Sequence, residues 1–290
     1  MVSKIDAHTQ LYGVIGYPVR HSFSPAMHHA AFHKAKLNAV YLALEVHPEN
    51  LKDALAGIKA LGISGLNVTV PHKEACIPFL DDVYPTAKLI GAVNTIHLKD
   101  GKLIGYNTDG RGFIRALKEI LKVNPKGKRF FILGAGGASR AVGFNLAKEG
   151  AKVVTFYDIV RSKAENLVID LRLNFPNCSI QLASTLPRHL KDFDCLINAT
   201  PVGMKKNDPL LIDPKVFHPK LAVCDLIYNP SRTKLLKLAK AKRLKTMNGL
   251  GMLLYQGVIA WELWTGKKAP VSVMKRALEK AIFYSQKLKV

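Results

Sequence analysis

A strand, a glycine-rich turn and the start of a helix follow one another near the middle of the chain, where residues 130–141 read FFILGAGGASRA. In a doubly wound α/β domain, such a turn lets backbone N–H groups at a helix N-terminus approach a pyrophosphate, because glycine has no Cβ to block the approach. The segment predicts a dinucleotide-binding turn, with an ordinary glycine-rich βα turn as the alternative. Ser139 departs from the full fingerprint, which has Gly or Ala at that position.

The composition is that of a globular chain large enough for more than one domain. The 290 residues suit two domains of ordinary size, and 48% of them are hydrophobic. An uninterrupted apolar run of about 18 residues is missing, and residues 1–10 lack the apolar segment of a signal peptide, so we expect a cytoplasmic protein without a membrane partner. The cysteines are widely spaced and are interpreted as reduced core thiols: Cys76, Cys178, Cys195 and Cys224.

The formal net charge of +22 raises the question of nucleic acid as a partner. Lys and Arg are spread along the whole chain, with short clusters such as residues 234–245, and aromatic residues do not alternate with them. We therefore expect a solvated basic surface and no nucleic-acid partner. Such a surface raises the local concentration of small anions such as phosphates and carboxylates.

The first part of the chain alternates strands and helices. Strands are expected at residues 11–15, 40–46, 65–70, 91–98 and 103–105, and helices at 25–36, 48–61, from 72 onward and at 111–121. Ser24 followed by Pro25 predicts an N-cap with proline at the first helical position. The alternation predicts an α/β fold with a largely parallel sheet.

A second α/β unit follows residues 123–128, which contain Asn124, Pro125 and Gly127 and therefore predict a domain boundary. Beyond the glycine turn, strands are expected at 153–157, 195–198 and 221–226, and helices at 161–173 and 231–241. The chain ends in two amphipathic helices, at about 250–264 and 271–288. No strand separates these helices, so we expect them to pack back on the first domain.

Several polar residues stand out from this framework. Asn67 and Thr69 share one face of a strand, and Lys73 lies near a helix start, where its charge opposes the helix dipole. That placement indicates either a functional lysine or a solvated surface residue. Asp109 is explained equally well as an ordinary helix N-cap. Ser22 lies outside the cap position that accounts for Ser24.

Gln256 lies inside an otherwise apolar helix, where a buried amide needs a partner, which could also be protein backbone. His28, His29 and His33 are expected to be exposed or half-buried and lack the carboxylate spacing of a metal site, so we expect no metal. A GxSxG elbow is also missing, which disfavours a Ser-His-Asp hydrolase.

The order of the motifs is more specific than any one of them. The chain reads SFSPAMH at 22–28, GLNVTVPHK at 65–73, GAVNT at 91–95, YNTDG at 106–110, GAGGASRA at 134–141, NATPVGM at 198–204, DLIYNPSRTKLL at 225–236 and NGLGMLLYQG at 248–257. Over nearly its full length it resembles the shikimate dehydrogenase family.

This resemblance implies an N-terminal α/β substrate domain and a Rossmann dinucleotide-binding domain with a cleft between them. The substrate domain would comprise residues 1–108 and be completed by the C-terminal helices at 250–290, and the Rossmann domain would comprise 109–249. The implied reaction is the reversible reduction of 3-dehydroshikimate to shikimate by a reduced nicotinamide. Quinate is the alternative substrate, and the implied assembly is a monomer or a homodimer.

Matching positions imply the roles of individual residues. Lys73 and Asp109 would be the catalytic pair. The substrate's carboxylate and hydroxyls would be bound by Ser22, Ser24, Asn67, Thr69, Asn94 and Gln256, with Tyr228 nearby. The coenzyme would be bound by Gly134, Ala135, Gly136, Gly137, Ala138, Asp158, Arg161, Thr200, Pro201, Val202, Gly203, Met204, Leu226 and Gly249.

The chain departs from the family at the coenzyme's adenosine end. Members of the NADP-using branch carry Asn-Arg-Thr after the second Rossmann strand, where this chain has Asp158, Ile159 and Val160. An acidic residue there binds the ribose 2′-hydroxyl of NAD and repels a 2′-phosphate. Arg140, Arg161 and Lys163 could still hold a phosphate. The cofactor is therefore NADP, as is commonest in the family, or NAD, as in its quinate/shikimate branch.

A protein of another class could use the same scaffold, since a fold does not fix a function. A non-catalytic nucleotide- or nucleic-acid-binding protein is this alternative. It would have no need of Lys73, Asp109, Asn94 and Gln256 together, so this set of residues favours the enzyme.

Overall fold

The structure, a computed structural model, describes residues 5–287 and divides into two compact units. The first unit contains the chain up to Thr108 and again from Gln256 onward, and the second is Asp109–Tyr255. The predicted boundary at residues 123–128 is wrong, because that segment connects a helix and a strand within the second unit. The predicted end of the last helix, at residue 288, lies outside the described residues.

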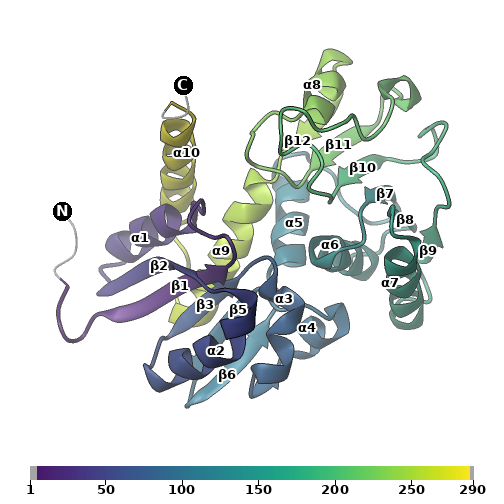
Figure 1. Cartoon of the computed structure of the whole chain (residues 1–290). Helices are drawn as coiled ribbons and strands as arrows, with labels where there is room; N and C mark the ends of the chain where they lie inside the picture. Colours follow the sequence, from purple (N-terminus) through teal and green to yellow (C-terminus); the bar gives the residue numbers. More distant parts are fainter. Residues whose placement is uncertain (1–4, 288–290) are drawn as a thin grey trace. The chain divides into compact units, whose positions relative to one another are not determined.

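The first unit is built on a mixed sheet (Figure 1). Its elements are β1 (Gln10–Gly16), α1 (Ser24–Lys34), β2 (Ala39–Glu45), η1 (Pro48–Asn50), α2 (Leu51–Ala60), β3 (Gly65–Val68), α3 (His72–Ala75), η2 (Ile77–Phe79), β4 (Asp82–Val83), α4 (Pro85–Ile90), β5 (Thr95–Lys99), β6 (Lys102–Tyr106), the later part of α9 (Leu250–Thr265) and α10 (Val271–Lys287). The strand order is β2-β1-β3-β5-β6-β4. Strand β5 runs antiparallel to both of its neighbours, and the other pairs are parallel.

Helices cover this sheet by burying apolar side chains at helical spacing. Leu51, Leu55 and Ile58 recur along one face of α2 and pack in one cluster with Ile15 and Leu66 of the strands. Helix α10 packs against α1, as expected for a C-terminal segment that returns to the first unit. Among residues 5–287, no helix is long and apolar enough to cross a membrane.

Two local expectations in the first unit are wrong. The strand expected at residues 91–98 begins only at Thr95, because Gly91 has φ +72° and ends helix α4. Ser24 is not an N-cap: α1 begins at Ser24 itself, the cap position is Phe23, and no side chain caps the helix. The Ser24 side chain hydrogen-bonds the Tyr41 side chain instead, so helix capping does not explain a serine at this position.

The second unit is a parallel sheet with helices on it (Figure 1). Its elements are α5 (Asp109–Glu119), β7 (Arg129–Leu133), α6 (Gly137–Lys148), β8 (Val153–Tyr157), α7 (Arg161–Asn174), β9 (Ser179–Leu182), β10 (Cys195–Asn198), η3 (Pro214–Val216), β11 (Ala222–Asp225), α8 (Lys234–Ala241), β12 (Lys245–Met247) and the start of α9. The order β12-β11-β10-β7-β8-β9, all parallel, is the doubly wound order of a Rossmann fold.

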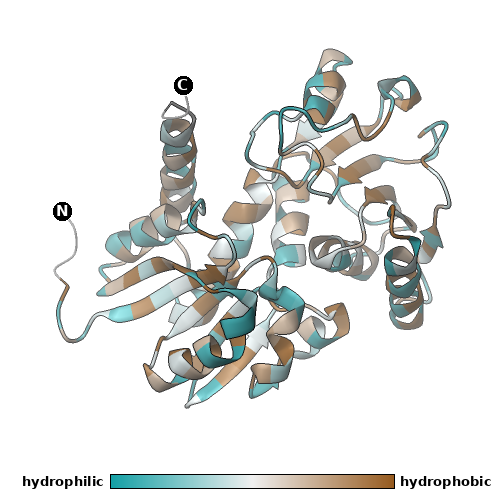
Figure 2. Ribbon diagram, in the orientation of Figure 1, coloured by the Kyte–Doolittle hydropathy of each residue, from teal (hydrophilic) through white to brown (hydrophobic). Residues whose placement is uncertain are grey.

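The central strands of this sheet are largely buried and are accordingly mainly apolar. Phe130, Ile132 and Val154 have no exposed surface, and Figure 2 shows the strands of this unit coloured mainly as hydrophobic. Helix α6 lies close to the sheet because a Cβ on Gly143 would come within 2.4 Å of Phe156 Cζ. The glycine turn between β7 and α6 therefore lies at the carboxyl end of a central strand, with the helix packed closely on the sheet.

Candidate active site

The glycine turn after β7 leaves the N-terminus of α6 open. Gly134 has φ +100°, a conformation that L side chains rarely adopt, and a Cβ there would come within 3.1 Å of the Ala199 carbonyl oxygen. Gly136 is the N-cap residue of α6, and a Cβ on it would meet no atom within 4 Å. The unsatisfied N–H groups of the first helical turn therefore face space that a phosphate group can fill.

The irregular Ser139 has a structural reason. Its side chain is fully buried, and its hydroxyl donates to the Gly134 carbonyl oxygen at 2.6 Å. This bond ties the first helical turn back to the start of the loop. Serine at this position therefore closes the turn and is compatible with a dinucleotide-binding geometry.

The predicted nicotinamide-side residues follow the carboxyl ends of neighbouring strands. The sheet order reverses between β7 and β10, and ligands of doubly wound sheets bind at this switch point. The glycine turn follows β7, residues 200–204 follow β10, and Leu226 follows β11. Gly249, after β12, approaches this loop so closely that a Cβ would lie 1.9 Å from the Leu226 carbonyl oxygen.

Two buried polar residues that the sequence reasoning missed hold these loops in place. Asn198 Oδ1 accepts from the backbone N–H and the hydroxyl of Thr200, and its Nδ2 donates to the Val202 carbonyl and to Asp225. Asp225 also accepts from the Thr233 hydroxyl and the Ile227 N–H. Burial raises the pKa of the Asp225 carboxyl to about 6, and these hydrogen bonds oppose the shift. Both residues open motifs that carry the family resemblance, NATPVGM and DLIYNPSRTKLL, from which only later residues were assigned a role.

At the adenosine end, Asp158 follows β8 directly and is hydrogen-bonded to the glycine turn. Its Oδ2 accepts from the Ala135 N–H at 2.7 Å, and its Oδ1 accepts from the Val160 N–H at 2.8 Å. Arg161 and Arg140, the arginines considered for phosphate binding, are ion-paired with Glu165 and Asp170, respectively. The loop therefore presents a fixed carboxylate beside arginines that already have acidic partners.

In the first unit, three of the predicted substrate residues meet in one buried cluster. Asn67, Asn94 and Gln256 are each at most 7% exposed. Asn94 Nδ2 donates to Gln256 Oε1 at 3.4 Å, and Asn67 Nδ2 donates to the Asn94 carbonyl oxygen at 3.3 Å. Helix α9 brings Gln256 to residues that lie more than a hundred positions earlier in the chain. The partner that a buried amide requires is therefore another polar side chain.

The remaining first-unit residues flank this cluster. Ser22 Oγ accepts from the Ser24 N–H at 3.3 Å, and Ser24 bonds Tyr41. Lys73 is half-buried in α3, and its carbonyl accepts the N–H of Val93 at 2.8 Å, which places its backbone beside the residue preceding Asn94. Thr69 lies just after β3, with its N–H bonded to the Ile15 carbonyl.

Asp109 and Tyr228 belong to the second unit. Asp109 is buried and is the first residue of α5, inside the first helical turn and not at the cap position that was considered for it. Tyr228 is half-buried in the loop after β11, and burial raises the pKa of its hydroxyl. Asp109 follows directly on Thr108, the last residue of this part of the first unit, whose N–H donates to Asn94 Oδ1 at 2.7 Å.

The histidines of α1 differ from expectation at one position. His28 is fully buried, and its ring lies among those of Phe32, Tyr41 and Trp264, with Tyr41 stacked on it at 4.4 Å between centroids. Within the described residues, no group of three His, Cys, Asp or Glu side chains could hold a metal ion.

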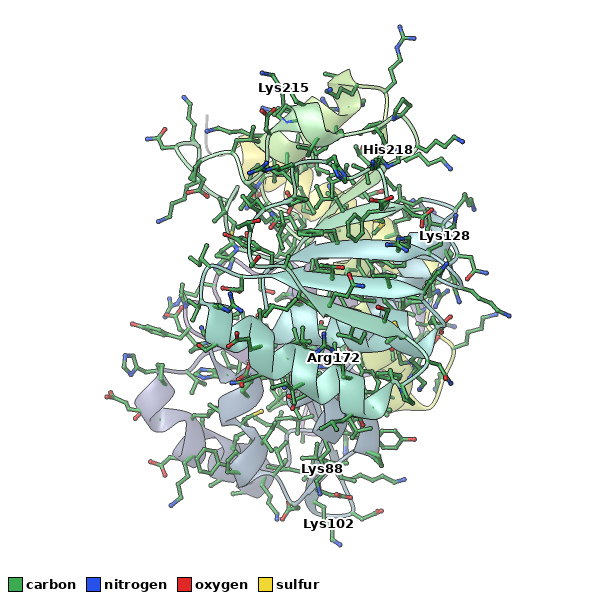
Figure 3. All side chains as sticks on the ribbon, turned by 90° about the vertical axis from the view of Figure 1, so that its right-hand side faces the viewer. Lys88, Lys102, Lys128, Arg172, Lys215 and His218 are labelled. Carbon is green, nitrogen blue, oxygen red and sulfur yellow. The ribbon has the colours of Figure 1, made fainter. Side chains whose placement is uncertain are left out.

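Some of the positive charge lies on exposed side chains of both units. The basic residues labelled in Figure 3 are exposed and come from separate parts of the chain: Lys88, Lys102, Lys128, Arg172 and Lys215. Lys128 is additionally paired with Asp194.

The sheet order and the glycine turn at the switch point define the class of this protein as a dinucleotide-binding protein with a further, separate unit. Two family models match the chain: the shikimate dehydrogenase substrate binding domain over residues 14–96, and the shikimate 5′-dehydrogenase C-terminal domain over residues 249–279. The chain belongs to the shikimate dehydrogenase family.

Curated relatives and solved structures agree over almost the full length. The chain is 48% identical over 284 residues to a shikimate dehydrogenase (NADP(+)) of Desulforamulus reducens, covering 96% of this chain and 98% of that one. It matches a crystal structure of shikimate dehydrogenase in complex with NADP+ with a TM-score of 0.90 and 45% identity, covering 97% and 99% of the chains. A shikimate 5-dehydrogenase of Listeria monocytogenes in complex with shikimate and NAD matches with a TM-score of 0.88 and 39% identity, covering 96% and 99%.

Proposed function

We propose that this chain catalyses the reversible reduction of 3-dehydroshikimate to shikimate with a reduced nicotinamide dinucleotide. The observation that supports it best is the buried cluster of Asn67, Asn94 and Gln256, because it lies in the unit matched by the family's substrate-binding model and offers several neutral hydrogen-bonding groups. Neutral amides suit a substrate whose recognition depends on hydroxyl groups. The basic surface favours the approach of its carboxylate.

The coenzyme fits the second unit. The open side of Gly136 and the first turn of α6 would hold the pyrophosphate, and the loops after β10 and β11 would border the nicotinamide. The bound coenzyme supplies the hydride. What remains for the protein is to orient the carbonyl, to stabilise negative charge on its oxygen and to deliver a proton to it.

We assign the proton transfer to Lys73 and Asp109. The Lys73 ammonium would donate to the developing alkoxide and stabilise its charge, and the Asp109 carboxylate would orient that ammonium. Both side chains are partly or fully buried, which strengthens charge interactions relative to bulk water. In the reverse direction the same pair would remove the proton from the substrate hydroxyl.

Replacement of Lys73 tests this assignment. We expect Lys73→Ala to lower kcat by about 10²- to 10⁴-fold, the usual contribution of a proton-transfer group, with little change in KM. Lys88→Ala, at an exposed lysine of α4, is the matched control and should leave kcat unchanged. Near-wild-type turnover of Lys73→Ala would refute the assignment, and intact activity in Asp109→Asn would mean that Asp109 is only part of a helix start.

We further propose that NAD is preferred over NADP. An acidic residue such as Asp158 after the second Rossmann strand would repel a 2′-phosphate, and Arg161 and Arg140 are ion-paired with Glu165 and Asp170. Of the relatives named above, one is named for NADP(+), one was solved with NADP+ and one with NAD. We therefore base the preference proposed for this chain on its own loop residues. The measurement is kcat/KM with NADH and NADPH, and a strong preference for NADPH would refute the argument.

An Asp158→Asn variant sharpens that test. It keeps an acceptor for the Ala135 N–H and removes the charge, so we expect the NADPH-to-NADH ratio of kcat/KM to rise by about tenfold, equivalent to about 1.4 kcal/mol. An unchanged ratio would show that the carboxylate does not face the 2′-position. Quinate oxidation, measured beside shikimate oxidation, decides between the two substrates.

A further inference from the structure

We propose that Tyr41 and Thr95 are positioning residues for substrate binding: they form a hydrogen-bond chain of one direction that fixes how Asn67, Asn94 and Gln256 present their amides. This inference rests on the proposed function of the first-unit cluster. All residues of this hydrogen-bond chain belong to the first unit, and Tyr41 and Thr95 are 1% and 0% exposed. Neither residue stands out in the sequence.

The direction of this hydrogen-bond chain is fixed by backbone groups, each of which can only donate or only accept. The Thr108 N–H, which can only donate, lies 2.7 Å from Asn94 Oδ1, so this atom is the amide oxygen. The Asn94 carbonyl, which can only accept, lies 3.3 Å from Asn67 Nδ2, so this atom is the amide nitrogen. The orientations of both amides therefore follow from the main chain.

Thr95 connects the two amides. Its hydroxyl has one proton, which it donates to Asn94 Oδ1 at 3.0 Å, and its oxygen accepts from Asn67 Nδ2 at 3.1 Å. Asn67 and Thr95 are direct partners across the β3–β5 ladder, which keeps these side chains in register. A hydroxyl is required here, because only it can accept from one amide while donating to the other.

Tyr41 begins the chain. Its hydroxyl donates to Asn67 Oδ1 at 2.7 Å, and its ring is held by stacking on His28 with an interplanar angle of 6°. Burial raises the pKa of this hydroxyl well above its usual value, so it keeps its proton at any working pH. Asn67 thus has both ends of its amide committed to Tyr41 and Thr95.

Gln256 ends the chain. Asn94 Nδ2 donates to Thr108 Oγ1 at 2.9 Å and to Gln256 Oε1 at 3.4 Å. The Gln256 oxygen is therefore turned toward Asn94, which fixes the orientation of the Gln256 amide. The hydrogen-bond chain thus carries the fixed direction of backbone groups through all three amides of the cluster.

The test is steady-state kinetics of Thr95→Val and Tyr41→Phe, which keep the side-chain shapes and remove the hydroxyls. We expect the KM for 3-dehydroshikimate to rise about tenfold in each, the usual effect of leaving a buried partner unsatisfied. The kcat should fall less than about threefold and the KM for the coenzyme should stay unchanged, because the chemical groups are untouched. Thr95→Ser, which restores the hydroxyl, should recover most of the wild-type KM.

Thr155→Val is the matched control. Thr155 is a buried threonine of β8 in the second unit whose hydroxyl bonds Gln181, so its replacement removes a comparable bond outside the chain. It should leave the substrate KM unchanged. In the Tyr41→Phe/Thr95→Val double variant, the rise in KM should be smaller than the product of the two single rises, since both act through Asn67.

Wild-type turnover together with an unchanged substrate KM in Thr95→Val would overturn this inference alone. A change in kcat and in both KM values that tracks a lower melting temperature would also overturn it, because that pattern marks a general loss of structure. A wild-type chain that fails to reduce 3-dehydroshikimate would overturn the proposed function and this inference with it.

Discussion

His28 should make the first unit lose stability in mild acid. The side chain is fully buried, stacks on Tyr41 and lies 5.5 Å from Trp264 between ring centroids. Burial lowers the pKa of its imidazole to about 3, and the nearby His29 contributes in the same direction. The native state therefore keeps this histidine neutral at a pH where an unfolded chain would protonate it.

The sign and size of the effect follow from that difference. An unfolded histidine has a pKa of about 6.5, so the unfolded chain binds the proton first as the pH falls. The stabilising contribution is complete above that value and is lost progressively as the pH falls toward 3. Between about pH 7 and about pH 4.5, the free energy of unfolding should fall by about 2 to 3 kcal/mol through this residue.

The experiment compares the wild type with His28→Phe, which keeps an aromatic ring on Tyr41 and removes the titrating group. Urea unfolding at the two pH values should show that the variant loses about 2 to 3 kcal/mol less than the wild type over this interval. Tryptophan fluorescence is a suitable signal, because Trp261 and Trp264, the only tryptophans of the sequence, both belong to the first unit.

Comparing differences between proteins cancels every other titrating group that the two share. His33→Gln, which removes an exposed histidine of the same helix, is the matched control for the loss of an imidazole. If His28→Phe loses as much stability as the wild type between the two pH values, the unfolded and folded chains protonate His28 alike and the reasoning is refuted.

Further predictions concern one glycine in each unit and a buried carboxylate of the second unit. Gly249→Ala should destabilise the second unit by about 3 kcal/mol or more, because the new Cβ would lie 1.9 Å from the Leu226 carbonyl oxygen. Gly57→Ala, in helix α2 of the first unit and with no atom within 4 Å of the new Cβ, should stabilise that unit by about 0.5 to 1 kcal/mol; thermal unfolding measures both. Burial raises the pKa of Asp225 to about 6, so its contribution to stability is present below the unfolded value and is lost as the pH rises through 6. Asp225→Asn should flatten that decline, measured by circular dichroism in urea, and an unchanged decline would contradict the assignment.

The second unit could be read from the sequence more completely than the first. Strands β8 and β10 have the predicted bounds, because strands buried on both faces are short, continuous apolar runs between polar segments. Strands β9 and β12 were missed. They are the outer strands of the sheet, and the residues Ser179, Gln181 and Lys245 in them are exposed, so no apolar run marks them.

In the first unit, the segment around Gly91 shows where local pattern fails. Residues 91–98 contain the spaced apolar residues of a strand, and the sequence alone does not reveal that Gly91 has a positive φ and ends helix α4. The four residues from Gly91 to Asn94 therefore form the connection that brings Asn94 into the buried cluster. Because the strand start was predicted too early, the connection that positions Asn94 was not predicted either.

Part of the candidate site can be identified from residue types in the sequence, and the rest only from the pairing of strands in the structure. Gln256 attracts attention in the sequence because an amide in an apolar segment needs a partner, and Asn94 is named by the resemblance to the family. Thr95 and Tyr41 do not attract attention, because threonine and tyrosine are ordinary strand residues. Their role depends on the register that sets Thr95 opposite Asn67, and on β2 and β3 both pairing with β1. The sequence identifies groups that could touch a substrate, but their direction is decided by strand register and by single backbone donors such as the Thr108 N–H.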